Sequence, residues 1–165
     1  MLDNIKIRKA KESEKETIKN LFQLYSYDFS EIYLDDVDEK GLYPCCRYID
    51  EYYTDKDRGL YIILVNNNPA GFFMINKYTY LLPEGTNSIS EFFVMRKYRR
   101  NKLGMKAANY IFDNYTGRME IRVLKRNLNA IPFWSNVIDK RNPSNHEITE
   151  MNKNDEDWIV HDILI

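Results

Sequence analysis

The sequence predicts a single domain of mixed α/β class, in which helices flank a central sheet that is mixed but mostly antiparallel. Three observations support this fold class. The chain has 165 residues, the usual size of one domain, so residues 1–165 are expected to fold as a unit. Strand–helix–strand units with short connections imply a parallel pair of strands within the sheet. Strands that follow one another across short turns imply antiparallel hairpins elsewhere in it.

The first quarter of the chain is predicted to hold a strand and then a helix. Apolar and basic residues alternate over 5–8, as expected of a half-buried strand. Ser13 is the expected N-cap of the helix, and Glu16 three residues later completes a capping box. The helix is expected to fade near Asp28, and 30–44 to form a loop or a short helix. Helical spacing is shown by Ile18, Leu21, Phe22, Leu24 and Tyr25.

The remaining elements are predicted from runs of strand-forming residues and from turn signals. Segment 66–70, Asn-Asn-Asn-Pro-Ala, is dense in turn-forming residues and predicts a hairpin. Gly117 follows a long helical pattern and is expected to end that helix. The predicted strands are 60–65, 71–75, 89–95, 119–124, 146–151 and 158–163, and the predicted helices are 48–53, 100–115 and 129–138.

Charge is balanced overall but unevenly distributed. The formal net charge is −1, which argues against a general nucleic-acid binder. Six acids fall within 28–39 and four within 50–57, whereas five bases fall within 96–102. A basic site for an anionic ligand that faces an acidic site for a cationic one would produce this split. Solvated loops of opposite sign explain the acidic runs equally well.

The sequence lacks the patterns of a zinc-binding protein and those of a secreted or membrane-spanning protein. The adjacent Cys45 and Cys46 are poorly placed to bridge and are expected to be buried thiols. Together with the distant His146 and His161 they lack the spacing of a zinc site, so no metal is expected. No apolar run suits a signal peptide or a membrane span, so we expect a cytoplasmic protein without a membrane partner.

The segment 94–108 is the most informative part of the sequence. A predicted apolar strand runs into a basic loop, and a helix with an apolar stripe follows at once. The first N–H groups of a helix have no intrahelical partner and lie at the positive end of its dipole, so anions bind there. Neither the P-loop pattern nor the G-x-G-x-x-G turn is present. The segment therefore predicts a phosphate site, with a solvated helix start as the alternative.

This region resembles the GNAT superfamily of acetyl-CoA-dependent N-acyltransferases. The family signature, Gln/Arg-x-x-Gly-x-Gly/Ala, is occupied by Arg-Arg-Asn-Lys-Leu-Gly over 99–104, after the family-like strand 91–94. With the later Asn127-x-x-Ala130, the resemblance covers about 60–134, and the order of elements matches over the whole chain. Lys102 stands where the family usually has its first glycine, and a glycine there permits close backbone approach.

The resemblance implies a GNAT-like fold and an enzyme that moves an acetyl group from acetyl-CoA, its co-substrate, to a primary amine of a small molecule or peptide. It implies that the coenzyme A pyrophosphate rests on the amides of 99–105 and that the pantetheine arm extends along 92–94, with strand 119–124 splayed away. A main-chain N–H near Val94 would polarise the thioester carbonyl. The expected coenzyme-binding residues are Phe92, Phe93, Val94, Arg99, Arg100, Asn101, Lys102, Leu103, Gly104, Met105, Asn127 and Phe133.

Proton transfer needs a base, because an alkyl ammonium has a pKa of about 10. Glu91 is the candidate catalytic base: it is the acid of an otherwise apolar strand, three residues before Val94, and burial would raise its pKa toward neutrality. A glutamate paired with an arginine or placed at a sheet edge is the alternative. Trp134 stands where the family commonly has an acid tyrosine, and an indole cannot protonate the leaving thiolate. Asn127 has a simple helix N-cap as its alternative role.

The amine site is expected on the first helix and the loop after it, where aromatic rings and carboxylates suit a cation. Its candidate residues are Tyr25, Tyr27, Asp28 and Glu31, with the acids of 35–39 nearby. Two alternatives to an enzyme remain: a catalytically silent acyl-CoA-binding sensor or interaction module, favoured by Trp134, and a small nucleic-acid binder that uses 96–102. A homodimer is a further expectation, from the resemblance alone.

Overall fold

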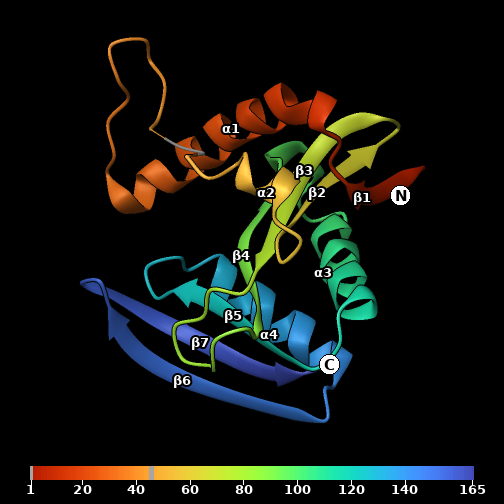
Figure 1. The fold of residues 1–165 in the computed structure, drawn as a ribbon, viewed down its shortest axis with the longest axis vertical. Helices are drawn as coiled ribbons and strands as arrows, with labels where there is room; N and C mark the ends of the chain where they lie inside the picture. Colours follow the sequence, from red (N-terminus) through yellow and green to blue (C-terminus); the bar gives the residue numbers. More distant parts are fainter. Residues whose placement is uncertain (1, 45–46) are drawn as a thin grey trace. The chain divides into compact units, whose positions relative to one another are not determined.

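The computed structural model describes residues 2–44 and 47–165, and within them seven strands form one sheet in the order β1-β2-β3-β4-β5-β7-β6 (Figure 1). The prediction for Cys45 and Cys46 lies outside the described residues. The strands are β1 Ile5–Lys9, β2 Gly59–Val65, β3 Asn68–Asn76, β4 Asn87–Val94, β5 Arg118–Leu124, β6 Asn145–Lys153 and β7 Glu156–Leu164. The helices are α1 Lys15–Tyr33, α2 Glu51–Thr54, α3 Leu103–Asn114 and α4 Ala130–Arg141, with short 3₁₀ turns η1 Glu12–Glu14 and η2 Arg96–Tyr98.

The strand pairing confirms a mixed sheet with much antiparallel pairing. β1 with β2, β5 with β7, and β6 with β7 are antiparallel pairs. β4 and β5 pair in parallel across the α3 connection, as the strand–helix–strand order predicts. That parallel pairing covers Asn87–Ile89, the first three residues of β4, opposite Met119–Ile121.

The chain divides into two compact units, which we describe separately. The first comprises the residues up to Met74 together with Glu91–Leu103, and the second comprises Ile75–Ser90 and Gly104–Ile165. The prediction that 1–165 form one domain stays a prediction. None of the helices in the described part of the chain is both long and apolar enough to cross a membrane.

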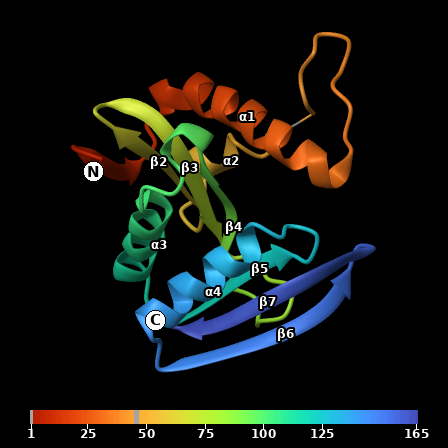
Figure 2. The same cartoon turned by 180° about the vertical axis from the view of Figure 1, so that it is seen from behind.

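The core of the first unit lies between α1, α2 and one face of β2, β3 and β4. Alternate residues of β2 face this core and the intervening ones face away, where Tyr61 stacks on Phe73 of β3 with ring centroids 4.7 Å apart. Figure 1 shows α1 as a long helix of this unit, and Figure 2 shows it from behind. The core residues include Ile18, Leu21, Phe22, Leu60, Ile62, Leu64, Phe72, Met74 and Phe93.

The predicted start of α1 is wrong in its capping residues. Ser13 lies inside η1, and the cap is made one turn earlier, where the Lys11 N–H donates to Oε2 of Glu14 at 2.8 Å. Both carboxylate oxygens of Glu14 also accept from Arg8 at 2.7 Å. This ion pair lowers the pKa of Glu14 to about 2. Glu14 rather than Glu16 therefore satisfies the start of the helix.

The predicted end of α1 is also wrong, since the helix runs past Asp28 to Tyr33. An aromatic series at helical spacing continues it: Tyr25 packs against Phe29 at 4.6 Å between ring centroids, and Phe29 stacks on Tyr33 at 5.8 Å. The helix ends at Leu34, which adopts a left-handed φ of +58° and donates its N–H to the carbonyl of Ser30.

The second unit is built on β5, β6 and β7 with helices α3 and α4. α3 begins at Leu103 rather than at the predicted Arg100. Gly117 follows the helix with a left-handed φ of +85°, as expected of a glycine that ends a helix. Glu120 of β5 is fully buried, and its carboxylate accepts the main-chain N–H groups of Tyr80, Leu81 and Leu82 at 2.7–3.0 Å. That carboxylate holds the connection between β3 and β4 in place. The buried core includes Ala107, Ala108, Ile111, Phe112, Met119, Ile121, Val123, Trp134, Val137, Ile138, Val160 and Ile163.

Candidate active site

The predicted phosphate loop has a distinctive backbone. After β4 and η2, both Arg100 and Lys102 adopt left-handed conformations, with φ +60° and +63°, and α3 begins at the next residue. These two conformations are why the helix starts later than its sequence pattern predicts. Arg100, Asn101 and Lys102 are exposed, whereas Leu103 is buried and anchors the end of the loop. The loop thus leads three exposed residues directly into a helix N-terminus.

Lys102 adopts a left-handed backbone conformation at the position where the family pattern has glycine. A left-handed φ is the conformation that glycine adopts without cost, while a side chain adds about 1–2 kcal/mol of strain there. Lysine in place of glycine at position 102 therefore costs conformational free energy. Gly104, the second signature glycine, lies in the first turn of α3 and is followed by Met105; both are half-buried.

The Arg99 side chain folds back along β4. Its Nε donates to the Val94 carbonyl at 2.7 Å, and its guanidinium lies 5.7 Å from the centre of the Phe93 ring. Its Nη2 forms an ion pair with Oδ2 of Asp28 on α1, and Arg96 donates to Oδ1 of Asp28 at 2.8 Å. The structure thus places Asp28 against the loop, with a carboxylate that accepts from two arginines.

β4 presents its predicted site residues on two faces. Phe93 and Val94 are buried, and Glu91 and Phe92 are half-buried. Phe93 belongs to the core under α1, whereas Phe92 stacks on Phe73 at 6.2 Å between ring centroids. Glu91 lies two residues before Phe93, so its side chain is on the face of the sheet that packs against α1.

Glu91 is hydrogen-bonded to Tyr25, a contact that the sequence analysis did not foresee. The Tyr25 hydroxyl donates to Oε2 of Glu91 at 2.5 Å. Burial, followed by the proximity of the Glu91 carboxylate, raises the pKa of Tyr25 well above its ordinary value. Tyr25 therefore stays protonated and stays a donor. In this contact the partner of Glu91 is a tyrosine and not the arginine that the alternative expected.

The four predicted amine-site residues separate into two pairs on α1. Tyr25 and Asp28 face β4 and the phosphate loop, one helical turn apart. Tyr27 is 62% exposed and Glu31 is also exposed, so this second pair lies on the solvent side of the helix. The structure brings together Tyr25, Asp28, Glu91 and Arg99, and leaves Tyr27 and Glu31 outside that cluster.

Gly71 of β3 is a site-building residue that the sequence analysis missed. A Cβ placed there would lie 2.1 Å from the Phe93 carbonyl oxygen, so only glycine lets β3 approach β4 this closely. The neighbouring Met95 N–H donates to the Ala70 carbonyl at 2.9 Å. A glycine inside a strand often marks a close backbone approach, which is the signal that could have found it.

The remaining predicted coenzyme residues lie in the second unit. Oδ1 of Asn127 accepts the Ala130 N–H at 3.1 Å, at the start of α4, although the residue in the N-cap position is Asn129. Phe133 is half-buried and meets Trp134 edge-on at 5.1 Å between ring centroids. Trp134 is 5% exposed and belongs to the core of this unit.

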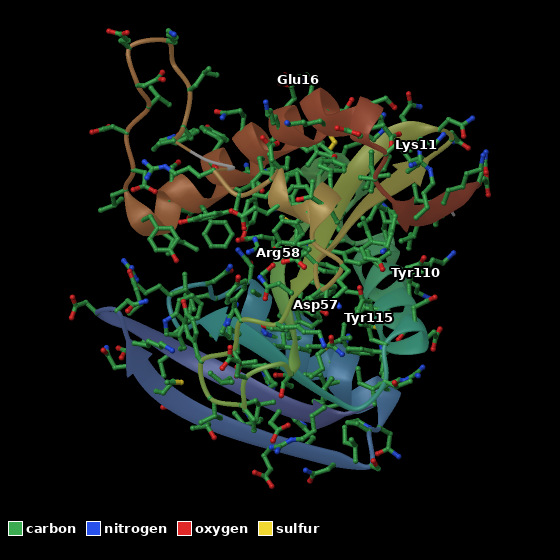
Figure 3. The ribbon with its side chains drawn as sticks, in the orientation of Figure 1. Lys11, Glu16, Asp57, Arg58, Tyr110 and Tyr115 are labelled. Atoms are coloured by element: carbon green, nitrogen blue, oxygen red, sulfur yellow. The ribbon has the colours of Figure 1, made fainter. Side chains whose placement is uncertain are left out.

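A separate hollow of about 260 Å³ lies beside α2 in the first unit, where Figure 3 labels Arg58. The cation of Arg58 is paired with Glu51 at 2.5 Å and with Asp55 at 3.2 Å. Within the described ranges, no cluster of three or more His, Cys, Asp or Glu could hold a metal ion. The hollow is lined by Lys9, Ala10, Tyr52, Tyr53, Thr54, Asp55, Lys56, Arg58 and Leu60.

Comparison with solved structures gives the class of the fold. An acetyltransferase from Thermus thermophilus aligns over 100% of both chains with a TM-score of 0.73 and 13% identity. The yncA protein of Salmonella typhimurium, solved with its cofactor acetyl-CoA, aligns over 97% of this chain and 93% of its own, with a TM-score of 0.67 and 14% identity. A spermidine N-acetyltransferase SpeG chimera from Vibrio cholerae and hSSAT aligns over 97% and 94%, with a TM-score of 0.59 and 14% identity.

These similarities show an acetyltransferase fold, and at such low identity they show the fold alone. The family model described as the acetyltransferase (GNAT) family matches residues 18–136, well over half of the chain. The chain therefore belongs to the GNAT acetyltransferase family. A comparison with curated proteins gives no match.

Proposed function

We propose that the protein is an N-acetyltransferase that moves the acetyl group of acetyl-CoA to a primary amine of a small molecule or peptide. The observation that carries this proposal is the loop after β4, whose two exposed, left-handed residues lead into the N-terminus of α3. Membership of the GNAT family supports acetyl-CoA as the ligand of this loop. The acetyl-CoA bound by yncA and the spermidine substrate class of SpeG support the two co-substrates.

The coenzyme pyrophosphate binds the main-chain amides of 99–105. A helix N-terminus offers unpaired N–H groups to an anion, and the exposed Lys102 and Arg100 add positive charge. The pantetheine arm lies along 92–94, beyond the stretch of β4 that pairs with β5. In this scheme Phe92 and Val94 line the arm, and the family resemblance assigns Asn127 and Phe133 to the same coenzyme.

Glu91 acts as the base. It takes a proton from the ammonium, and the neutral nitrogen attacks the thioester carbonyl carbon; a C–N bond forms and the C–S bond breaks. The electron pair of that bond leaves on the coenzyme A sulfur, which takes a proton from water, because the buried Trp134 has no acidic proton to offer. The hydroxide left by that water takes the second proton of the nitrogen, which gives the neutral amide. A main-chain N–H near Val94 stabilises the negative charge on the carbonyl oxygen.

The outward side of α1 attracts the amine before it reaches Glu91, which lies against the other side of the helix. Tyr27 and Glu31, with the acids of 35–39, supply the ring faces and carboxylates for this attraction. The structure gives Asp28 a different partner, so in this scheme it supports the loop rather than the amine.

The test is the release of coenzyme A thiol from acetyl-CoA in the presence of a panel of primary amines. Replacement of Glu91 by Gln keeps the shape of the side chain and removes the base, so the rate should fall by about 10²–10⁴-fold. The control is Glu147→Gln, at an exposed glutamate of β6, which should leave the rate unchanged. Failure of every amine to release thiol would overturn the proposal.

A catalytically silent acyl-CoA-binding module is the second candidate, favoured by the buried Trp134 at the position of the usual acid. Thermal melts with and without acetyl-CoA separate binding from catalysis. A ligand at 100 times its Kd adds about 2.7 kcal/mol of stability, which raises Tm by several degrees. Replacement of Gly104 by Leu should abolish that rise, while Lys140→Leu on α4 should retain it. A rise in Tm without thiol release would favour the silent module.

A further inference from the structure

The hydrogen bond between Tyr25 and Glu91 joins α1 to β4 within the first compact unit. An ionised carboxylate can only accept, so the phenol is the donor whenever Glu91 is ready to act as a base. We propose that Tyr25 is a positioning residue for acetyl transfer: its hydroxyl orients the Glu91 carboxylate and sets the pH above which that carboxylate is ionised. This inference rests on the proposed role of Glu91 as the base.

The Tyr25 ring is held tightly enough to orient another side chain. Its centroid lies 4.6 Å from that of Phe29, 5.7 Å from Phe93, 5.8 Å from Phe72 and 5.9 Å from Phe22. These four rings come from α1, β3 and β4, so the phenol is packed from three elements. Ring contacts of this kind favour one side-chain position.

A second contact keeps α1 in register with β4. One turn beyond Tyr25, the Asp28 carboxylate accepts from Arg96 and Arg99, and Arg99 in turn donates to the Val94 carbonyl. The two contacts are spaced i, i+3 on one face of the helix. Rotation or sliding of α1 would therefore break both, so the hydroxyl stays in reach of Glu91.

The hydrogen bond from Tyr25 affects the ionisation of Glu91 in a direction that can be predicted. A hydrogen bond donated to a carboxylate stabilises the ionised form and lowers its pKa, whereas burial raises it. The phenol keeps its proton, because burial and the neighbouring Glu91 raise its own pKa. Loss of the hydroxyl removes this one donor while Glu91 keeps its half-buried place and its other surroundings, and Glu91 should then need a higher pH to ionise.

The kinetic test is the Tyr25→Phe variant, which removes one oxygen and keeps the ring. The acid limb of kcat against pH should move upward by about one unit, so that kcat on that limb falls about tenfold and recovers on the high-pH plateau. KM for acetyl-CoA should stay within about twofold of its original value. The matched control is Tyr48→Phe, the same change at a 65% exposed tyrosine of the first unit, which should leave the profile in place.

A second variant tests the opposite direction. A ring-fluorinated tyrosine placed at position 25 is a stronger donor of nearly the same shape, so the acid limb should move downward. A merely structural role for Tyr25 predicts no movement in either variant, or an equal loss of rate at every pH. An unmoved acid limb in both variants would overturn the proposal.

A measurement without turnover separates this proposal from the proposed function. Carboxyl ¹³C NMR titration, with the Glu91 signal assigned through Glu91→Gln, gives the pKa of Glu91 directly. It should rise in Tyr25→Phe and fall with the fluorinated tyrosine. A protein that acetylates no amine but shows these shifts would end the proposed function and leave the coupling standing. Acetylation with an unshifted Glu91 pKa would end the coupling alone.

Discussion

Asp28 and Arg99 form an ion pair that ties α1 to the loop proposed to hold the coenzyme. The same guanidinium donates to the Val94 carbonyl at 2.7 Å, so a single side chain connects the helix, the end of β4 and the start of the loop. Arg96 adds a second contact to the Asp28 carboxylate at 2.8 Å. The coenzyme loop is thus held from the helix proposed to carry the amine site.

Replacement of Asp28 by Asn should weaken coenzyme binding. The amide keeps the size of the side chain but removes the charge that both arginines meet, so Arg99 should hold the loop less firmly. The arginines are 67% and 43% exposed, which limits the loss to about 1 kcal/mol, or about a fivefold rise in KM for acetyl-CoA. Glu31→Gln, on the solvent side of the helix, should leave that KM unchanged. A rise in KM for the amine alone would instead support direct contact of Asp28 with the acceptor.

Lys102→Gly should stabilise the protein and keep or improve coenzyme binding. Glycine relieves the left-handed strain at φ +63° but is more flexible in the unfolded chain, so the net gain in unfolding free energy should be below about 1 kcal/mol. Lys106→Gly, inside α3, is the matched control and should lower stability by roughly 0.5–1 kcal/mol. Urea unfolding of both variants measures the two changes in unfolding free energy, which should be opposite in sign. A loss of acetyl-CoA affinity in Lys102→Gly would show that the ammonium, rather than the turn, serves the ligand.

Gly71→Ala should destabilise the first unit and displace Glu91 from its position for catalysis. The added methyl would collide with the Phe93 carbonyl, and backbone cannot move aside as a side chain can. We expect a loss of about 1–3 kcal/mol, together with a lower kcat because Glu91 lies two residues along the same strand. Gly41→Ala is the control: its φ is +73° with open space around it, so only backbone strain changes. Equal losses in the two variants would refute the close approach.

Stability should decline as the pH falls from 6.5 toward 4 because of His161. Its ring lies against His146, with Nδ1 of His161 3.0 Å from Nε2 of His146, and burial followed by this neighbour lowers the pKa of His161 to about 4. The folded protein then binds fewer protons than the unfolded chain within this window, so the contribution, about 3 kcal/mol, is complete above pH 6.5 and lost progressively below it.

Urea unfolding at several pH values between about 7.5 and 5 measures this dependence. His161→Phe should flatten it, because the titrating group is gone. His146→Gln should keep most of it, because burial is the larger cause of the shift. A His161→Phe protein that loses stability as steeply as the original would place the proton uptake elsewhere.

The strands and the loop before α3 were predictable because their signals are local. Turn residues and runs of strand-forming residues mark β2, β3, β4 and β5, and a basic run before a helical pattern marks the loop. The end of α1 was missed because Phe29 and Tyr33 extend the helix through ring contacts, although the charged residues around them read as a loop. Tertiary packing overrides such local preference.

The residues of the proposed site were named from the sequence, but their contacts were not predictable. Glu91 and Tyr25 were both candidates, yet 66 positions separate them, and sequence spacing does not say that a phenol meets a carboxylate. Asp28 was assigned to the amine by its acidic neighbours, although one helical turn places it beside Tyr25 and toward Arg99. His146 and His161 are likewise distant in sequence and adjacent only through the antiparallel pairing of β6 with β7.

The division of α1 into an inward pair and an outward pair bears on how this protein can diversify. Tyr25 and Asp28 are each committed to a partner, so mutation at either position disturbs the existing machinery. Tyr27 and Glu31 lie outward on the same helix, where surface substitutions usually change stability by less than about 0.5 kcal/mol. Substitutions on the outward side, where the acceptor amine is proposed to be attracted, can therefore change acceptor preference without disturbing the inward pair.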